Sequence, residues 1–126
     1  MNRELKFRGL DIENNTWIVG SIIKKENHFT WIYPHNQETL SFTNLVQVKT
    51  ETIGQYTGFK DDSGKEIFEG DILNSTDANG VDEFIDTFKI VWDADKGGFM
   101  IEYLSDDEYY NLEELPDCII IGNVYE

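Results

Sequence analysis

Glycines divide residues 55–73 into short apolar pieces, and this spacing limits what the chain can fold into. The run Asp61-Asp62-Ser63-Gly64 is typical of a tight turn, because Asp and Ser side chains bond nearby backbone groups and glycine accepts positive φ. Glycine interrupts the chain again shortly before the apolar pair at 72–73. This pattern predicts short strands joined by hairpins. The residues expected to build the turns are Gly58, Asp61, Gly64, Gly70 and Asp71.

Most of the remaining chain also consists of strand-like pieces separated by polar turns. Residues 3–8 alternate apolar and polar side chains, which predicts a short, half-buried strand. The continuous apolar run from Cys118 to Ile121 predicts a strand buried on both faces. Trp92 and Phe99 flank a polar loop, so we expect their rings to meet across a hairpin. Further strands are expected at 17–23, 28–33, 46–50, 84–92 and 99–104.

Residues 105–115 form the one segment for which the sequence predicts a helix. Ser105 can cap its N-terminus with Glu108 at the capping-box position, and Pro116 stops it. The predicted fold class is therefore all-β, with at most one short helix. The expected architecture is a small, partly closed β-barrel or sandwich of roughly eight to ten short strands.

The length of 126 residues fits one domain, spanning residues 1–126. Two small β subunits that divide near residues 50–54 and share one core are an alternative. The single cysteine cannot form an internal disulfide, which agrees with the cytoplasm of a bacterial host cell. The longest apolar runs contain only a few residues, so we expect neither a membrane span nor a secretory signal.

Charge is distributed unevenly along the chain. Residues 1–60 hold seven Lys and Arg against six Asp and Glu, a net charge of +1. Residues 61–126 hold three Lys and nineteen Asp and Glu, a net charge of −16. An acidic half of this kind repels phosphate backbones, which argues against nucleic acid as a partner. Three roles are open for this acidic half: it is a solubilising surface, it attracts a basic partner, or it imitates the charge of nucleic acid.

No motif in the sequence predicts a catalytic or metal site. Asp93, Asp95 and Gly98 match three positions of a calcium-binding loop, but Gly97 and Leu104 stand where that loop needs oxygen ligands. Neither histidine has a cysteine or a second histidine at metal-ligand spacing. We therefore expect no enzyme activity, no cofactor and no metal ion.

Tyr109 and Tyr110 are adjacent aromatic residues in an acidic neighbourhood. Adjacent side chains on one element cannot both face inward, so at least one ring is expected at the surface. An exposed aromatic ring beside acidic groups suits a protein partner with a basic and apolar surface. The predicted partner surface consists of Asp106, Asp107, Glu108, Tyr109 and Tyr110.

The central stretch also carries a resemblance. Residues 56–72 read Tyr-Thr-Gly-Phe-Lys-Asp-Asp-Ser-Gly-Lys-Glu-Ile-Phe-Glu-Gly-Asp-Ile, residues 3–8 read Arg-Glu-Leu-Lys-Phe-Arg, and residues 121–126 read Ile-Gly-Asn-Val-Tyr-Glu. In order and spacing, these segments resemble the YopX family of small proteins encoded by bacteriophages and prophages. The resemblance implies a mostly β fold and a phage origin. It implies no established activity and no catalytic residues.

Together these features favour a non-enzymatic phage or prophage accessory protein. We expect it to bind a host or phage protein through its acidic surface. The alternative is a nucleic-acid-binding β-barrel module that uses the N-terminal half. Association into a homo-oligomer is also open.

Overall fold

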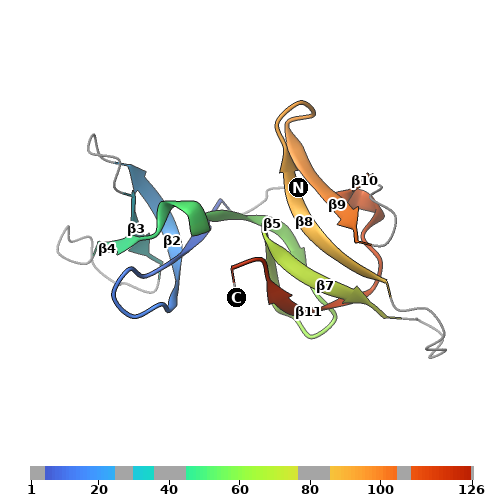
Figure 1. Cartoon of the computed structure of the whole chain (residues 1–126), viewed down its shortest axis with the longest axis horizontal. Coiled ribbons are helices and arrows are strands. Elements are labelled where there is room, and N and C mark those ends of the chain that lie inside the picture. The colour runs from blue at the N-terminus through green and yellow to red at the C-terminus, as the bar shows by residue number, and fades with distance from the viewer. Residues whose placement is uncertain (1–4, 25–29, 36–44, 77–85, 105–108, 126) are drawn as a thin grey trace. The chain divides into compact units, whose positions relative to one another are not determined.

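The computed structural model describes residues 5–24, 30–35, 45–76, 86–104 and 109–125. Within these ranges the chain contains eleven strands, two single 3-10 turns and no α-helix (Figure 1). The strands form two antiparallel sheets, and neither sheet closes into a barrel. The prediction of an all-β fold is therefore confirmed. No helix in this described part of the chain has the length and apolar character needed to cross a bilayer.

Contacts along the chain separate it into two units, Met1–Tyr56 and Thr57–Glu126. The boundary falls inside one strand, β5 (Gly54–Lys60), which therefore contributes to both units. We call these the first unit and the second unit and describe each by itself. The expected division near residues 50–54 into subunits that share one core stays a prediction.

The first unit is a curled antiparallel sheet in the strand order β4-β3-β2-β1, with the start of β5 beside β1. An isolated bridge between Asp11 and Val48 joins the end of β1 to β4, so the sheet bends back on itself. Its elements are β1 (Phe7–Leu10), β2 (Trp17–Lys24), β3 (Thr30–Pro34), β4 (Val46–Val48) and the 3-10 turn η2 (Thr50–Thr52).

Two glycines let the strands of the first unit approach closely around its small interior. Ile32 and Val48 are almost fully buried there. A Cβ at Gly9 would lie 2.9 Å from Val48 Cγ2, and a Cβ at Gly20 would collide with the carbonyl of Tyr33. The interior is therefore packed too tightly at these positions for any side chain.

The second unit is built on a five-stranded sheet in the order β10-β9-β8-β7-β11, together with the β5–β6 hairpin (Figure 1). β11, although last in the chain, pairs with β7 at one edge of this sheet. The elements are β6 (Glu66–Phe68), β7 (Asp71–Ser75), β8 (Thr87–Asp93), β9 (Gly98–Tyr103), β10 (Tyr109–Asn111), the 3-10 turn η3 (Leu112–Glu114) and β11 (Cys118–Asn123).

One face of the five-stranded sheet carries the core of the second unit. Alternate side chains along each strand point to this face, as the period of a β-strand requires. The rings of Trp92 and Phe99 meet edge-on across the β8–β9 hairpin, with centroids 5.1 Å apart, which confirms that prediction. The buried cluster consists of Ile67, Leu73, Phe88, Ile90, Phe99, Ile101, Leu112 and Cys118.

The helix predicted at 105–115 is wrong for its described part. Residues 109–111 form β10 and residues 112–114 form η3, whereas 105–108 lie outside the described residues. A helix of about three turns is marginal without packing. Pairing with β9 instead places the ring of Tyr110 against Tyr103, with centroids 5.2 Å apart. Tertiary packing therefore overrides the capping signals.

The expectation that residues 118–121 are buried on both faces is also wrong. Cys118 is buried, but Ile119 is 40% exposed and Ile121 is 54% exposed. β11 is an edge strand, and its register with β7 shifts between Ile120 and Gly122. A continuous apolar run indicates full burial only where a sheet is covered on both sides.

Candidate functional site

Asp61 is a buried carboxylate that ties the β5–β6 turn to β11. Its Oδ1 accepts hydrogen bonds from the backbone N–H of Ser63 (2.9 Å), the hydroxyl of Ser63 (2.7 Å) and the backbone N–H of Lys65 (2.9 Å). Its Oδ2 accepts one from the backbone N–H of Ile120 (3.0 Å). An open sheet edge presents unpaired backbone groups, and Asp61 satisfies one of them on β11.

These hydrogen bonds keep Asp61 ionised. Burial alone would raise its pKa, because a low-dielectric site disfavours the charged form. The hydrogen bonds from Ile120, Ser63 and Lys65 outweigh burial and lower the pKa of the Asp61 carboxyl below the ordinary value for aspartate. Asp61 is therefore a fixed negative charge at neutral pH with its oxygens already engaged, which suits a structural role.

The neighbouring turn residue Asp62 also holds β11 in place. Its backbone N–H donates to the carbonyl of Cys118 (2.9 Å), and its carboxylate accepts from the hydroxyl of Thr76 (2.8 Å). Burial, followed by the nearby carboxylates of Asp62, Asp61 and Asp117, raises the pKa of the Cys118 thiol to about 11. The thiol is therefore protonated at neutral pH and is a poor nucleophile.

The other predicted turn residues lie in β5 (Gly58), in the β5–β6 turn (Gly64) and at the β6–β7 connection (Gly70 and Asp71). Gly58 and Gly64 have φ values of +90° and +89°, and Gly70 has +94°. The carboxylate of Asp71, 1% exposed, accepts a hydrogen bond from the N–H of Phe68 across this turn (2.8 Å). These residues shape the backbone, and nothing in their geometry suits a reaction.

Gly70 also connects β8 to the C-terminal segment. Its N–H donates to the carbonyl of Ile90, and its carbonyl accepts from the N–H of Val124, each at 2.9 Å. A Cβ at this position would lie 3.1 Å from the ring of Tyr125. Glycine is thus required at position 70 both for the positive φ and for the close packing against Tyr125.

Of the residues predicted as a partner surface, the two tyrosines lie in the described ranges. Tyr109 is 55% exposed on β10, whereas Tyr110 points to the core face of the sheet. Asp106, Asp107 and Glu108 lie outside the described residues, in the segment that connects β9 to β10.

Tyr109 belongs to the side of the five-stranded sheet opposite the core, which we call the outer face. Cross-strand pairing places Ile72, Lys89, Glu102 and Tyr109 side by side in one row. The neighbouring row contains Ile119, Asn74 and Thr87. The outer face is defined by these residues together with Leu104, which continues the second row and donates its N–H to the carbonyl of Thr87 (3.1 Å).

Three apolar side chains on the outer face are open to solvent. Leu104 is 50% exposed, Tyr109 is 55% exposed and Ile119 is 40% exposed. Met100, one row further along, is 3% exposed, so the accessible part of the face lies over the first two rows. Sequence reasoning missed Leu104 and Ile119, because only the strand register places Leu104 next to Tyr109 and places Ile119 on the same face, at the opposite edge of the sheet.

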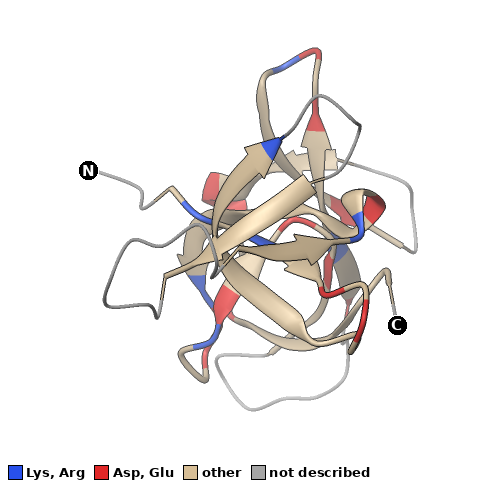
Figure 2. Ribbon diagram, turned by 90° about the vertical axis from the view of Figure 1, so that its left-hand side faces the viewer, with Lys and Arg blue, Asp and Glu red and all other residues tan. Residues whose placement is uncertain are grey.

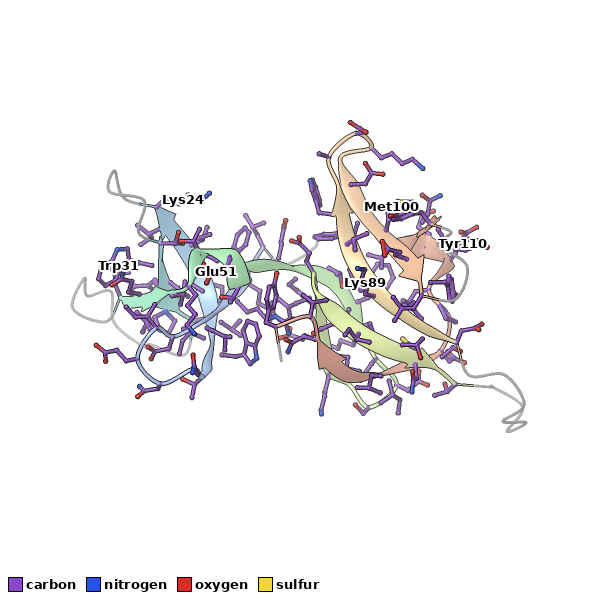
Figure 3. All side chains as sticks on the ribbon, in the orientation of Figure 1. Lys24, Trp31, Glu51, Lys89, Met100 and Tyr110 are labelled. Carbon is purple, nitrogen blue, oxygen red and sulfur yellow. The ribbon has the colours of Figure 1, made fainter. Side chains whose placement is uncertain are left out.

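The outer face carries an ion pair near its middle. Lys89 Nζ lies 3.3 Å from Glu102 Oε1, and these side chains are 33% and 17% exposed. Figure 3 labels Lys89 on β8 and Met100 on β9. Acidic residues outnumber basic ones in the described ranges of the second unit, 57–76, 86–104 and 109–125. Figure 2 colours the acidic and basic residues of the described chain. The face therefore carries exposed apolar groups and belongs to a unit whose described residues are mostly acidic among the charged ones.

Two cations of the first unit, Lys6 and Arg8, contact aromatic rings of the same unit. The guanidinium carbon of Arg8 lies 4.4 Å from the centre of the Trp17 ring, and Lys6 Nζ lies 4.9 Å from that of Tyr56. Arg8 is 8% exposed and Tyr56 is 5% exposed. Neither Arg8 nor Tyr56 is open to a ligand in this arrangement, which weakens the case for a nucleic-acid surface on this unit.

One pair in the first unit has the composition of a catalytic dyad. Ser21 Oγ lies 2.9 Å from His35 Nε2, and both residues are exposed. Among the described residues no acidic side chain bonds the imidazole, so the pair lacks the third member of a triad. Within the same ranges, no three His, Cys, Asp or Glu side chains cluster to hold a metal ion.

Comparison with known proteins places the chain in a family. The profile of the family described as YopX protein matches residues 6–126. The crystal structure of protein EF1440 from Enterococcus faecalis is similar, with a TM-score of 0.61 and 24% sequence identity over 99% of this chain and 96% of that one. This likeness shows a shared fold. No curated protein matches the chain. Because the family profile spans almost all of its residues, this protein belongs to the YopX family.

Proposed function

We propose that the protein is a non-enzymatic accessory protein of a phage or prophage that binds another protein through the outer face. The observation that carries this proposal is the exposure of Leu104, Tyr109 and Ile119 on one side of a sheet whose other side already buries the core. An antiparallel sheet with one core face normally presents polar side chains on the other. Leu104 and Tyr109 are diagonal neighbours across the β9–β10 ladder, and adjacent apolar side chains that are open to solvent instead mark an interaction site.

The charge of the second half supports a basic partner. Its net charge of −16 attracts positively charged proteins and speeds their approach. An exposed tyrosine is well suited to anchor such a contact, since its ring is large, rigid and apolar with a polar tip. The partner therefore combines basic and apolar side chains.

The geometry of the polar groups supports a role without catalysis. Asp61 and Asp71 are engaged by backbone N–H groups, and the Cys118 thiol is held protonated. The alternative, a nucleic-acid-binding module in the first unit, has less support, because Arg8 is buried against an aromatic ring.

Affinity capture with matched variants tests this proposal. The tagged protein is used as bait in lysates of lysogenic host cells, beside a Leu104→Ser/Tyr109→Ala variant. A Leu5→Ser/Ile12→Ala variant is the control, because it removes two exposed apolar side chains from the first unit. We expect parent and control to capture the same protein and the outer-face variant to lose it. Capture that is lost only with the control variant would refute the proposed surface.

A further inference from the structure

We infer that Lys89 pairs with Glu102 on the outer face only in the free protein, and that an arginine of the partner takes its place at Glu102 in the complex. This inference rests on the proposed function, and it specifies the chemistry of the partner. The partner segment carries an arginine flanked by apolar side chains. Its guanidinium binds Glu102 while its apolar neighbours cover Tyr109 and Leu104.

The position of the ion pair is the first observation. Lys89 and Glu102 face each other directly across the β8–β9 ladder. In the same row, Ile72 lies beside Lys89 and Tyr109 lies beside Glu102. Lys89 is the single cation that the described residues place on the outer face. Glu102 is therefore an acidic group set among apolar side chains, neutralised by a residue from the neighbouring strand.

The weakness of such a pair makes replacement feasible. Partly exposed ion pairs of lysine contribute little, because water competes and a long side chain must be held still. Lysine also reaches solvent easily on its flexible stem. An arginine can bind a carboxylate through two parallel N–H donors, which a lysine ammonium cannot do. The exchange therefore favours the arriving arginine.

Covering the face requires a cation at Glu102, and the arriving arginine can supply it in place of Lys89. When a partner excludes water from the outer face, an unpaired Glu102 carboxylate becomes costly to bury. A guanidinium placed at Glu102 also lies beside the ring of Tyr109, the cross-strand neighbour, where a cation–π contact is favourable. The ammonium of Lys89 is released toward solvent.

The test uses a defined probe, a hexapeptide of alternating arginine and leucine with blocked ends. Amide signals of the full chain are followed by NMR during titration, and calorimetry gives the affinity. We expect shifts on β8, β9 and β10. Lys89→Met should tighten binding about two- to five-fold, the range expected when an exposed competing ion pair is removed. Lys96→Met is the matched control. It removes the same positive charge as Lys89→Met, but from an exposed position on the β8–β9 turn.

A second matched pair tests the acceptor. Glu102→Gln should weaken binding of the peptide about five-fold or more, whereas Asp95→Asn, on the exposed β8–β9 turn, should change it much less. Circular dichroism and the melting temperature confirm that each variant is folded.

The outcomes separate this inference from the proposed function. If the peptide shifts the outer-face amides but Lys89→Met and Lys96→Met change affinity equally, long-range charge explains the effect. The inference that an arginine replaces Lys89 at Glu102 is then overturned, and the outer face remains supported as a binding surface. If the peptide fails to bind, or shifts amides elsewhere only, both the inference and the proposed surface are wrong.

Discussion

Replacing Asp61 by asparagine gives the sharpest test of how the central motif stabilises the fold. The amide oxygen of an asparagine can keep the three hydrogen bonds that Oδ1 now accepts from Ser63 and Lys65. The amide nitrogen then faces the N–H of Ile120, so that donor loses its acceptor. Hydrogen bonds to charged groups contribute about 1.5–3 kcal/mol each, and neutral ones about half as much. We therefore expect a loss of about 2–4 kcal/mol in the free energy of unfolding.

The assay is urea unfolding of the parent and of the Asp61→Asn variant, with Asp62→Asn as the control. Asp62 is exposed, so its replacement should cost about 0.5 kcal/mol or less. Amide exchange measured by NMR should accelerate at Ile120 in the Asp61 variant. Equal losses in the two variants, or an unchanged exchange rate at Ile120, would refute the role assigned to Asp61.

The pH dependence of the same variant follows from the lowered pKa of Asp61. A carboxyl group with a lowered folded-state pKa contributes stability that is fully present above its unfolded pKa, about 3.9. This contribution is lost as the pH falls from there through the folded-state pKa. The difference in stability between the parent and Asp61→Asn should therefore shrink as the pH is lowered below about 3.9. A constant difference would contradict the assignment.

Three further predictions concern the turns, the cysteine and nucleic acid. Gly70→Ala should lower the stability of the fold by about 1–3 kcal/mol, and by more than Gly64→Ala, because a Cβ at Gly70 meets Tyr125 whereas one at Gly64 meets nothing within 4 Å. Equal losses of stability in thermal unfolding would contradict this. Cys118 should resist a thiol reagent in the native protein at pH 8 and react on unfolding, and rapid native labelling would show that the thiol is accessible. Gel-shift titration at physiological salt should show no binding to single- or double-stranded oligonucleotides, and salt-sensitive binding would support the alternative function.

Local features of the fold could be predicted from the sequence. The composition of the turn at Asp61–Gly64 is local information, and Gly64 has a positive φ. The β8–β9 hairpin was also predictable, because Trp92 and Phe99 flank a short polar loop and their rings are in contact. In both cases the residues that decide the structure lie within a few positions of one another.

The errors arise where distant segments decide the structure. Residues 109–111 pair with β9, and this pairing outweighs the helix signals at Ser105 and Pro116. The burial of residues 118–121 depends on β11 lying at a sheet edge, which the run of apolar residues does not encode. Propensity is a weak guide wherever long-range pairing competes with it.

The candidate surface was only partly predictable for the same reason. An adjacent pair of tyrosines shows that one ring points outward, and the ring of Tyr109 does so. Leu104 and Ile119 have no such signal. Ile119 joins the outer face because β11 pairs with β7, which places it opposite Asn74. A shift of one residue in that register would turn Ile119 toward the core.

The central claim is that the family motif builds the fold, whereas the outer face of the five-stranded sheet binds the partner. The most direct test is the affinity of the captured partner for two folded variants, Tyr109→Ala on the outer face and Lys65→Ala on the exposed motif turn. We predict that Tyr109→Ala weakens binding at least about tenfold, as expected for an aromatic side chain that the partner buries, and that Lys65→Ala leaves it unchanged. Binding that is lost with Lys65→Ala and retained with Tyr109→Ala would show instead that the motif turn is the recognition surface.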